Sequence, residues 1–420
     1  MIEPPAPTAR ERIAALDIVR GIAVMGIFSV NVVGMAMIEI AYFYPPAFGF
    51  DGFADKLMWT INFILVDGKF RSLFSMLFGA SMVLVIERAI AAGRSPAKTH
   101  YARMIVLMAF GLLHFSLLWW GDILTHYAAA GMVVFHAWKY RARTLLITAV
   151  VGFLFYAAPS FYFTGKERAN FEASMTPDAT AHQREQADKR RQALFPDAER
   201  LTRDRAEHET IATRFRAVVP DGLIEPFELG PLWIETLSLM LLGMAGYKSG
   251  FLTGQWNVRG YRRVAVTGLG VGLVAYALLA AYTWRSGFRP PEHNAAYGGY
   301  SPIFRPVMAS GYAALIILLA RPGGWLVERL AAVGRTAFSN YLGCTLIGLL
   351  VFYGFAGGLY GDVSRAQAWL LVPPTWLLML AWSKPWLDRF HYGPFEWLWR
   401  SLARGRLQPL RKLSPASPLA

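Results

Sequence analysis

Apolar runs of roughly 20 residues recur along the whole chain, and this is the length at which an α-helix crosses a bilayer. Charged residues make up only 17% of the 420 residues, whereas a soluble globular chain has about 25%. We therefore predict an all-α polytopic membrane protein, built as a bundle of about ten transmembrane helices. The expected spans are residues 17–38, 70–87, 104–121, 123–138, 144–163, 229–248, 262–283, 304–320, 336–356 and 366–383.

Three segments depart from this pattern. Residues 57–66 are apolar but too short to span, so we expect an interfacial or re-entrant helix at the outer face. Residues 164–228 are highly charged and predict a helical extramembrane insertion, and 390–406 interleave aromatic residues with arginines, as in an amphipathic interfacial helix. The expected parts are N-terminal transmembrane helices (1–163), the charged insertion (164–228), C-terminal transmembrane helices (229–389) and a cytoplasmic amphipathic tail (390–420).

The formal net charge of +14 is carried mostly by short loops between apolar runs. This is the pattern of the positive-inside rule, and with Arg10 and Arg12 inside it predicts that both termini are cytoplasmic in a multi-pass protein of the cell inner membrane. Anionic lipid explains the basic residues better than nucleic acid does, so no nucleic-acid partner is expected. Cys344 is the only cysteine, which excludes an intramolecular disulfide and a cysteine metal cluster.

Ionisable residues at membrane depth are rare and indicate function or pairing. Asp17 and Arg20 share a face at the start of the first span, either as an interfacial ion pair or as an anion site in which Asp17 orients the guanidinium. Asn31 lies near the same face and is either a helix contact or part of the same polar track.

His114 lies well inside its apolar segment and is either a buried histidine bonded to a neighbouring helix or a general base. Asp122 follows the turn at Gly121, where it can cap the next helix, orient His114, or do both. His126 is a secondary candidate nearer the interface. The spacing matches no established ligand pattern, so we expect no metal.

Two further polar sets are candidates for a site. Lys69 either extends to the outer interface or lines a water-filled cavity beside a broken helix. Arg335, Asn340 and Tyr341 open the segment GRTAFSNYLGCT, which indicates either an anion site at a helix start or flanking charge with Asn-mediated packing.

Five stretches in order resemble the motifs of the bacterial YeiB-like integral membrane proteins, a family long of unknown function. They are ALDIVRGIAVMGIFSVN, DGKFRSLFSMLFGA, LLHFSLLWWGDILTHYAAAG, GRTAFSNYLGCT and GPFEWLWR. More distantly, the DxxRG start, carried by Asp17, Arg20 and Gly21, is similar to the transmembrane acyltransferase superfamily. In that superfamily an acyl-CoA on the cytoplasmic side supplies the acyl group for an acceptor on the other side.

The resemblance implies acyl transfer across the bilayer, with acyl-CoA, expected to be acetyl-CoA, as co-substrate. Arg20 and Arg335 would hold its phosphates, and His114, oriented by Asp122, would deprotonate an acceptor or carry the acyl group. Hydrogen-bond donors to the developing oxyanion would come from Lys69, Asn31 or Tyr341.

The expected partners are membrane lipids and an acceptor that is a small molecule or linked to a glycan or lipid, while a homodimer stays open. The alternative function is a transporter or exporter of a small anionic or lipid-linked solute, because polar residues strung through helices suit that role as well.

Overall fold

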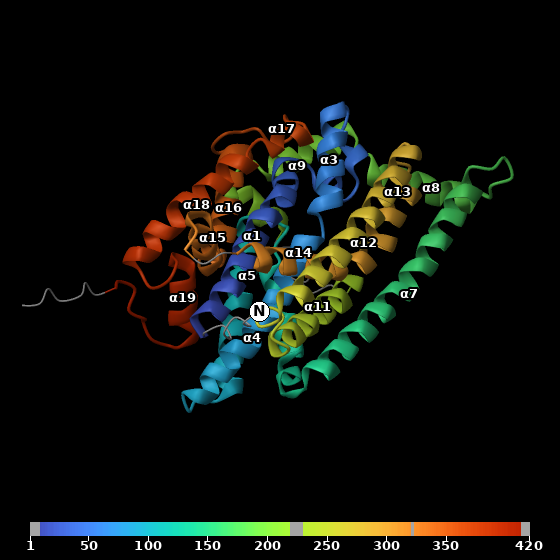
Figure 1. Cartoon of the computed structure of the whole chain (residues 1–420). Coiled ribbons are helices and arrows are strands. Elements are labelled where there is room, and N and C mark those ends of the chain that lie inside the picture. The colour runs from blue at the N-terminus through green and yellow to red at the C-terminus, as the bar shows by residue number, and fades with distance from the viewer. Residues whose placement is uncertain (1–8, 219–229, 321–322, 413–420) are drawn as a thin grey trace, which may run out of the picture.

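The computed structural model describes residues 9–218, 230–320 and 323–412, and these ranges form a bundle of helices (Figure 1). The first half contains α1 (Ala9–Ala36), α2 (Glu39–Phe43), η1 (Pro45–Ala47), α3 (Phe53–Leu65), α4 (Lys69–Ala91), α5 (Pro96–Leu117), α6 (Leu124–Val133), η2 (Phe135–Lys139) and α7 (Ala142–Ser174). Then follow α8 (Ala181–Leu194), α9 (Ala198–Glu207), α10 (Ile211–Val218), α11 (Pro231–Lys248), α12 (Val258–Arg285), α13 (Pro290–Asn294), η4 (Ala295–Tyr300) and α14 (Ser301–Leu319). The last helices are α15 (Trp325–Arg335), α16 (Ala337–Phe352), α17 (Arg365–Trp369), α18 (Val372–Arg389) and α19 (Pro394–Ala403).

The prediction of an all-α polytopic membrane protein is confirmed. Within the described ranges, six segments are long and apolar enough to cross a membrane. They are Ala14–Ala36, Phe53–Ala91, Pro96–Leu117, Ala142–Ser174, Val258–Arg285 and Pro290–Leu319. The second of them joins α3 to α4, so the apolar stretch at 57–66 continues into its neighbour through a turn at Gly68, which has a φ of 73°.

Several segments expected to span are shorter than a bilayer requires. The stretch 123–138 forms α6, which has 10 residues, followed by the short η2, and α16 has 16 residues. At roughly 1.5 Å per residue these helices extend about 15 Å and 24 Å, whereas the hydrocarbon core is about 30 Å thick. Most residues of both helices are buried among neighbouring helices. The neighbours therefore shield the ends of these short helices from lipid, and neither helix has to cross the bilayer alone.

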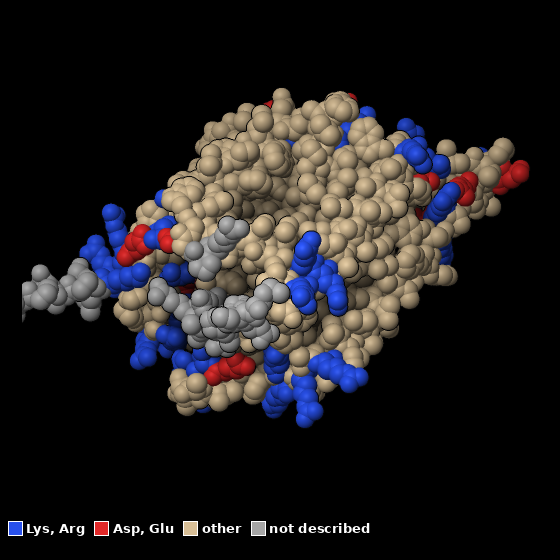
Figure 2. Space-filling model, in the orientation of Figure 1, with Lys and Arg blue, Asp and Glu red and all other residues tan. Residues whose placement is uncertain are grey.

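The two ends of the bundle differ in charge. α3, α9 and α17 lie toward one end of the bundle. The helix α19 and the C-terminal part of α4 lie toward the other end (Figure 1). Lys and Arg side chains gather around the end that carries α4 and α19, while much of the face above it is uncharged (Figure 2). We call the end with α4 and α19 the basic end; this separation is the one that the loop charges predict.

The charged insertion folds as helices against the end opposite the basic end. α7 continues past residue 163 to Ser174 before α8 begins, so the first part of the expected insertion prolongs a transmembrane helix. Downstream, Tyr360 donates a hydrogen bond to Asp204 at 2.6 Å, and the ring of His208 stacks on Tyr360 with centroids 4.1 Å apart. These contacts dock α9 on the loop after α16. The remainder of the expected insertion, 219–228, lies outside the described residues.

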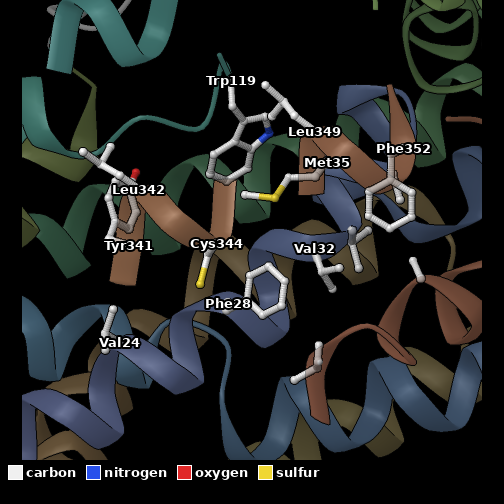
Figure 3. Close-up of a cluster of buried hydrophobic side chains, with 14 of the residues drawn as sticks. Val24, Phe28, Val32, Met35, Trp119, Tyr341, Leu342, Cys344, Leu349 and Phe352 are labelled. Atoms are coloured by element: carbon white, nitrogen blue, oxygen red, sulfur yellow. The ribbon is translucent and has the colours of Figure 1, made fainter. Parts of the chain in front are cut away.

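An apolar cluster holds α1 against α16. Phe28 of α1 and Cys344 and Leu349 of α16 are each at most 4% exposed and belong to one buried cluster (Figure 3). Cys344 therefore lies where a small apolar side chain is needed.

Close backbone approach fixes α1 against α15. A Cβ placed on Gly21 would lie 2.1 Å from the carbonyl oxygen of Leu330, and one on Gly334 would lie 1.7 Å from that of Asp17. Only glycine allows these two helices to come so close, as is common where membrane helices cross. Arg20 and Arg335, each next to one of these glycines, therefore lie at the same helix crossing.

Substituting Gly334 by Ala is expected to destabilise the protein by about 1–3 kcal/mol, because the added methyl group must push α15 away from α1. Thermal unfolding of the purified protein in detergent measures the effect. Gly343→Ala is the matched control, since a Cβ there meets nothing within 4 Å. Equal melting temperatures for the two variants would contradict the proposed close packing.

The docking of α9 should respond to pH through two opposing groups. Burial raises the pKa of Asp204 to about 6, from an ordinary value near 3.8. As the pH falls from 6 to 3.8, the buried carboxylate becomes protonated, the cost of burying its charge disappears, and docking becomes more stable. Burial lowers the pKa of His208 to about 4, so falling pH weakens docking from about 6.5 downward. Asp204→Asn leaves only the histidine effect. We expect its α9 amides to lose hydrogen-exchange protection from pH 6.5 to 4, after correction for intrinsic rates, more than wild type does. If protection of the α9 amides changed with pH equally in both proteins, Asp204 would not offset the effect of His208.

Candidate active site

A cavity of about 460 Å³ opens near the basic end of the bundle, and this volume lies in the range of small-molecule sites. We call it the basic cavity. Five arginines line it: Arg20, Arg88, Arg103, Arg335 and Arg400. They come from α1, α4, α5, α15 and α19, so distant parts of the chain build one mouth.

The mouth carries more positive than negative charge. Of its arginines, only Arg20 has a carboxylate partner among the described residues: Asp17, whose Oδ1 accepts from Nη1 at 2.8 Å. The other carboxylate of the lining, Glu396, accepts hydrogen bonds from the backbone N–H groups of Phe338 (2.7 Å) and Ser339 (3.1 Å) at the start of α16. Burial lowers the pKa of Arg400. An anionic ligand would therefore relieve an unbalanced cluster of cations.

Arg20 is held in place rather than free to swing. Its second terminal nitrogen donates to Ser81 of α4 at 2.8 Å, so the side chain bridges two helices while it faces the cavity. Arg335 is exposed and has no hydrogen-bond partner among the described residues. The mouth thus offers one anchored and, within the described ranges, one unpaired guanidinium, both on the lining that the sequence indicates as an anion site.

The walls become apolar away from the mouth. Along α4 the lining passes from Arg88 through Leu77 to Phe74, and along α5 from Arg103 to Leu107. The far end, which we call the floor, is formed by Ile123, Tyr127 and Tyr341. A ligand with an anionic head and an uncharged arm would match this gradient.

His114 and Asp122 are in direct contact. Nδ1 of His114 lies 3.0 Å from Oδ1 of Asp122, and both side chains are almost completely buried. The other oxygen of Asp122 accepts from the backbone N–H of Thr125 at 2.8 Å, so Asp122 also caps α6. Capping and orientation of the imidazole, which the sequence leaves as alternatives, are both present.

Nε2 of His114 lies 3.0 Å from Oγ1 of Thr345 on α16. A carboxylate only accepts hydrogen bonds, so opposite a carboxylate Nδ1 is the donor; in the tautomer that carries its proton there, Nε2 can accept from the threonine hydroxyl. Thr345 is fully buried and was not among the residues that the sequence indicates. Its signal, a hydroxyl one helical turn after Tyr341, is too common to select from sequence.

The floor separates His114 from the basic cavity. His114 is 2% exposed and does not line the cavity, but its ring centroid lies 5.3 Å from that of Tyr341, which does. Hence Tyr341 lies between the cavity lining and the imidazole of His114.

Other predicted site residues lie apart from this group. The amide of Asn340 donates to Thr336 (3.0 Å) and Ser383 (3.2 Å) and accepts from Trp382 (2.9 Å), which is helix packing rather than ligand binding. Asn31 is half-buried and forms no side-chain hydrogen bond with another described residue.

Lys69 belongs to a second buried polar region. Its ammonium group is fully buried, donates to the carbonyl of Phe63 and lies over the ring of Tyr276. It therefore neither reaches the outer interface nor lies against His114.

Nearby, Glu235 is shared by two arginines, Arg71 at 2.7 Å and Arg305 at 3.1 Å. Sequence reasoning missed Glu235 and Arg305, although a lone charge in each of two apolar segments is a usable signal for a buried pair. His126 lies beside this region and bonds to Thr236 at 2.9 Å.

The mouth also contains arginines that the sequence indicates only as basic charges for predicting membrane sidedness. Arg103 stacks on Trp399 of α19 at 4.1 Å, and Arg400 lies over Tyr392 at 4.7 Å. The tail helix predicted to lie on the membrane surface thus completes the basic cavity. As for metals, no three His, Cys, Asp or Glu side chains converge anywhere in the described ranges.

Comparison with known proteins gives a family but no activity. A family described as "Protein of unknown function (DUF418)" matches residues 246–406. The uncharacterized protein YxaH of Bacillus subtilis is 30% identical over 414 residues, which cover 96% of each chain. The uncharacterized protein YeiB of Escherichia coli is 29% identical, over 97% of this chain and 98% of its own. No solved structure matches significantly. The five motifs, the helical bundle and these full-length similarities agree, and the chain belongs to the YeiB-like family of multi-pass membrane proteins.

Proposed function

We propose that this protein is a membrane acyltransferase that takes an acyl group from acyl-CoA at the basic end and passes it to a hydroxyl or amine acceptor from the opposite end. The observation that carries the proposal is the basic cavity, with its arginines at the mouth, apolar walls and a floor beside a His–Asp pair. Acyl-CoA combines phosphates, an uncharged arm and a terminal thioester in the same order.

The arginines suit phosphate groups. A guanidinium forms paired, charge-assisted hydrogen bonds with phosphate oxygens, and several lie around one opening. With the phosphates at Arg20 and Arg335, the arm would run along α4 and α5, and the thioester would approach Tyr341 at the floor. Acetyl-CoA is the simplest donor for a cavity of this size.

His114 would supply the base. Asp122 fixes its tautomer, and Nε2 is left as the proton acceptor, which is the arrangement general-base catalysis requires. Tyr341 would turn away to admit the thioester and could then donate a hydrogen bond to its oxygen.

Sidedness follows from the loop charges. If the basic end faces the cytoplasm, as positive flanking charge favours, the cavity opens where acyl-CoA is made. Both termini are then cytoplasmic, and the protein resides in the inner membrane. The acceptor, a small molecule or a group linked to a glycan or lipid, would arrive from the far side.

A transporter is the second candidate, because Glu235 with Arg71 and Arg305 places ion pairs deep in the bundle. Liposome uptake of a solute without acetyl-CoA cleavage would favour it over the enzyme.

Purified full-length protein in nanodiscs is expected to cleave acetyl-CoA, with water or an added acceptor taking the acyl group. His114→Gln should slow release of the CoA thiol by about 10²–10⁴-fold, because the general base is lost. His182→Gln, an exposed histidine on α8, is the control. No cleavage by wild-type protein would refute the proposed function, and equal rates in both variants would remove His114 from it.

Arg335→Ala is expected to weaken CoA binding by about 10-fold or more, because a charged hydrogen bond contributes about 1.5–3 kcal/mol. Calorimetric titration of CoA into the nanodisc protein measures the Kd. Arg335 is the informative choice because no described residue depends on it for an ion pair.

Arg262→Ala is the matched control for CoA binding, since Arg262 is exposed on α12 and outside the basic cavity. Equal Kd values for the two variants would place the CoA phosphates elsewhere.

A further inference from the structure

We propose that Thr345 carries the acyl group, as an ester on its hydroxyl, between acyl-CoA and the acceptor. The proposal rests on the function proposed above and adds a catalytic residue to it. Asp122, His114 and Thr345 would act as orienting group, base and nucleophile.

The geometry is that of an activated hydroxyl. Asp122 and Thr345 lie on opposite sides of the His114 ring, each at 3.0 Å from one of its nitrogens. A nucleophile within hydrogen-bond reach of a base, with the base oriented by a third group, is the common signature of covalent acyl transfer. Three separate segments, α5, the turn before α6, and α16, meet to form it.

The hydroxyl of Thr345 is directed away from its usual partner. Several buried threonines in this bundle donate to the carbonyl one turn back, as Thr375 does to Leu371 (2.8 Å) and Thr283 to Leu279 (3.0 Å). Thr345 has no such bond, and among the described residues its hydroxyl meets only Nε2 of His114. Its proton is therefore already on the path to the base.

Thr345 also lies in the right direction from the basic cavity. It follows Tyr341 by one turn on the same face of α16, so it is the next polar group beyond the floor. Turning Tyr341 aside would bring a thioester at the floor toward the hydroxyl. The same position is closer to the end from which the acceptor would come.

A spare hydrogen-bond donor lies beside the pair. Thr125, whose backbone N–H caps Asp122, has a fully buried hydroxyl with no partner among the described residues. Such an unpaired group is costly in a membrane protein unless another molecule completes it. The oxygen of a tetrahedral intermediate would be a suitable acceptor.

The chemistry balances in two steps. Oγ1 of Thr345 attacks the thioester carbon, its proton moves to Nε2 of His114, the C–S bond breaks, and the CoA sulfur leaves with that proton. The acceptor oxygen or nitrogen then attacks the ester carbon and gives its proton to Nε2. The C–O bond to Thr345 breaks, and Oγ1 takes the proton back.

The test uses the full chain in nanodiscs with acetyl-CoA and no acceptor. A covalent intermediate lets isotopically labelled CoA enter the acetyl-CoA pool, and mass spectrometry should find an acetyl group on the peptide that contains Thr345. Thr345→Ser keeps the hydroxyl and should retain exchange. Thr345→Val keeps the shape and should lose exchange by about 10³-fold or more. Thr375→Val, which removes a back-bonded hydroxyl, is the control.

The outcomes separate the two proposals. If wild-type protein cleaves acetyl-CoA but Thr345→Val exchanges normally, or the acetyl group is found on another residue such as His114, Thr345 is not the carrier while the acyltransferase stands. If wild-type protein neither cleaves acetyl-CoA nor exchanges CoA, both proposals fail. Where Thr345→Val melts well below wild type, the serine variant and the acetylated peptide of the wild-type protein decide.

Discussion

The contact between His114 and Asp122 ties together the helical segments around the floor of the basic cavity. In a bilayer a buried imidazole or carboxylate needs a partner inside the protein, and each here supplies the other's. Through Asp122 the pair also starts α6, and through Thr345 it reaches α16. One polar group of three side chains therefore fixes three helical segments relative to one another, next to the floor of the basic cavity.

Helix type and membrane residence follow from the sequence because both depend on local properties, namely apolar run length and charge in loops. The pairing of His114 with Asp122 is also within reach, since a tight turn at Gly121 joins them. The short helices α6 and α16 are not, because their apolar residues would equally suit a full span. Only the tertiary packing decides that they lie inside the protein.

The predicted site residues also differ in whether a local sequence pattern or only tertiary packing places them in the site. Arg20 and Arg335 lie near the chain's basic loops, and their meeting depends on the close crossing at Gly21 and Gly334, which no local pattern reveals. Asn340 carries the same sequence signal as its neighbour Tyr341, yet one packs against α18 and the other lines the cavity. A shift of one position around a helix changes the direction of a side chain by about 100°, and sequence alone does not fix that rotation.

The floor formed by Ile123, Tyr127 and Tyr341 has a consequence for the membrane itself. A wide passage through a bundle of this kind would let protons and ions run down their gradients. In the described residues the lining of the basic cavity includes Tyr127 and Tyr341 but not His114, so this cavity by itself offers no such passage. Under the proposed function, an acyl group handed from one residue to the next would cross the bundle without an open channel, and the cell would keep its membrane potential.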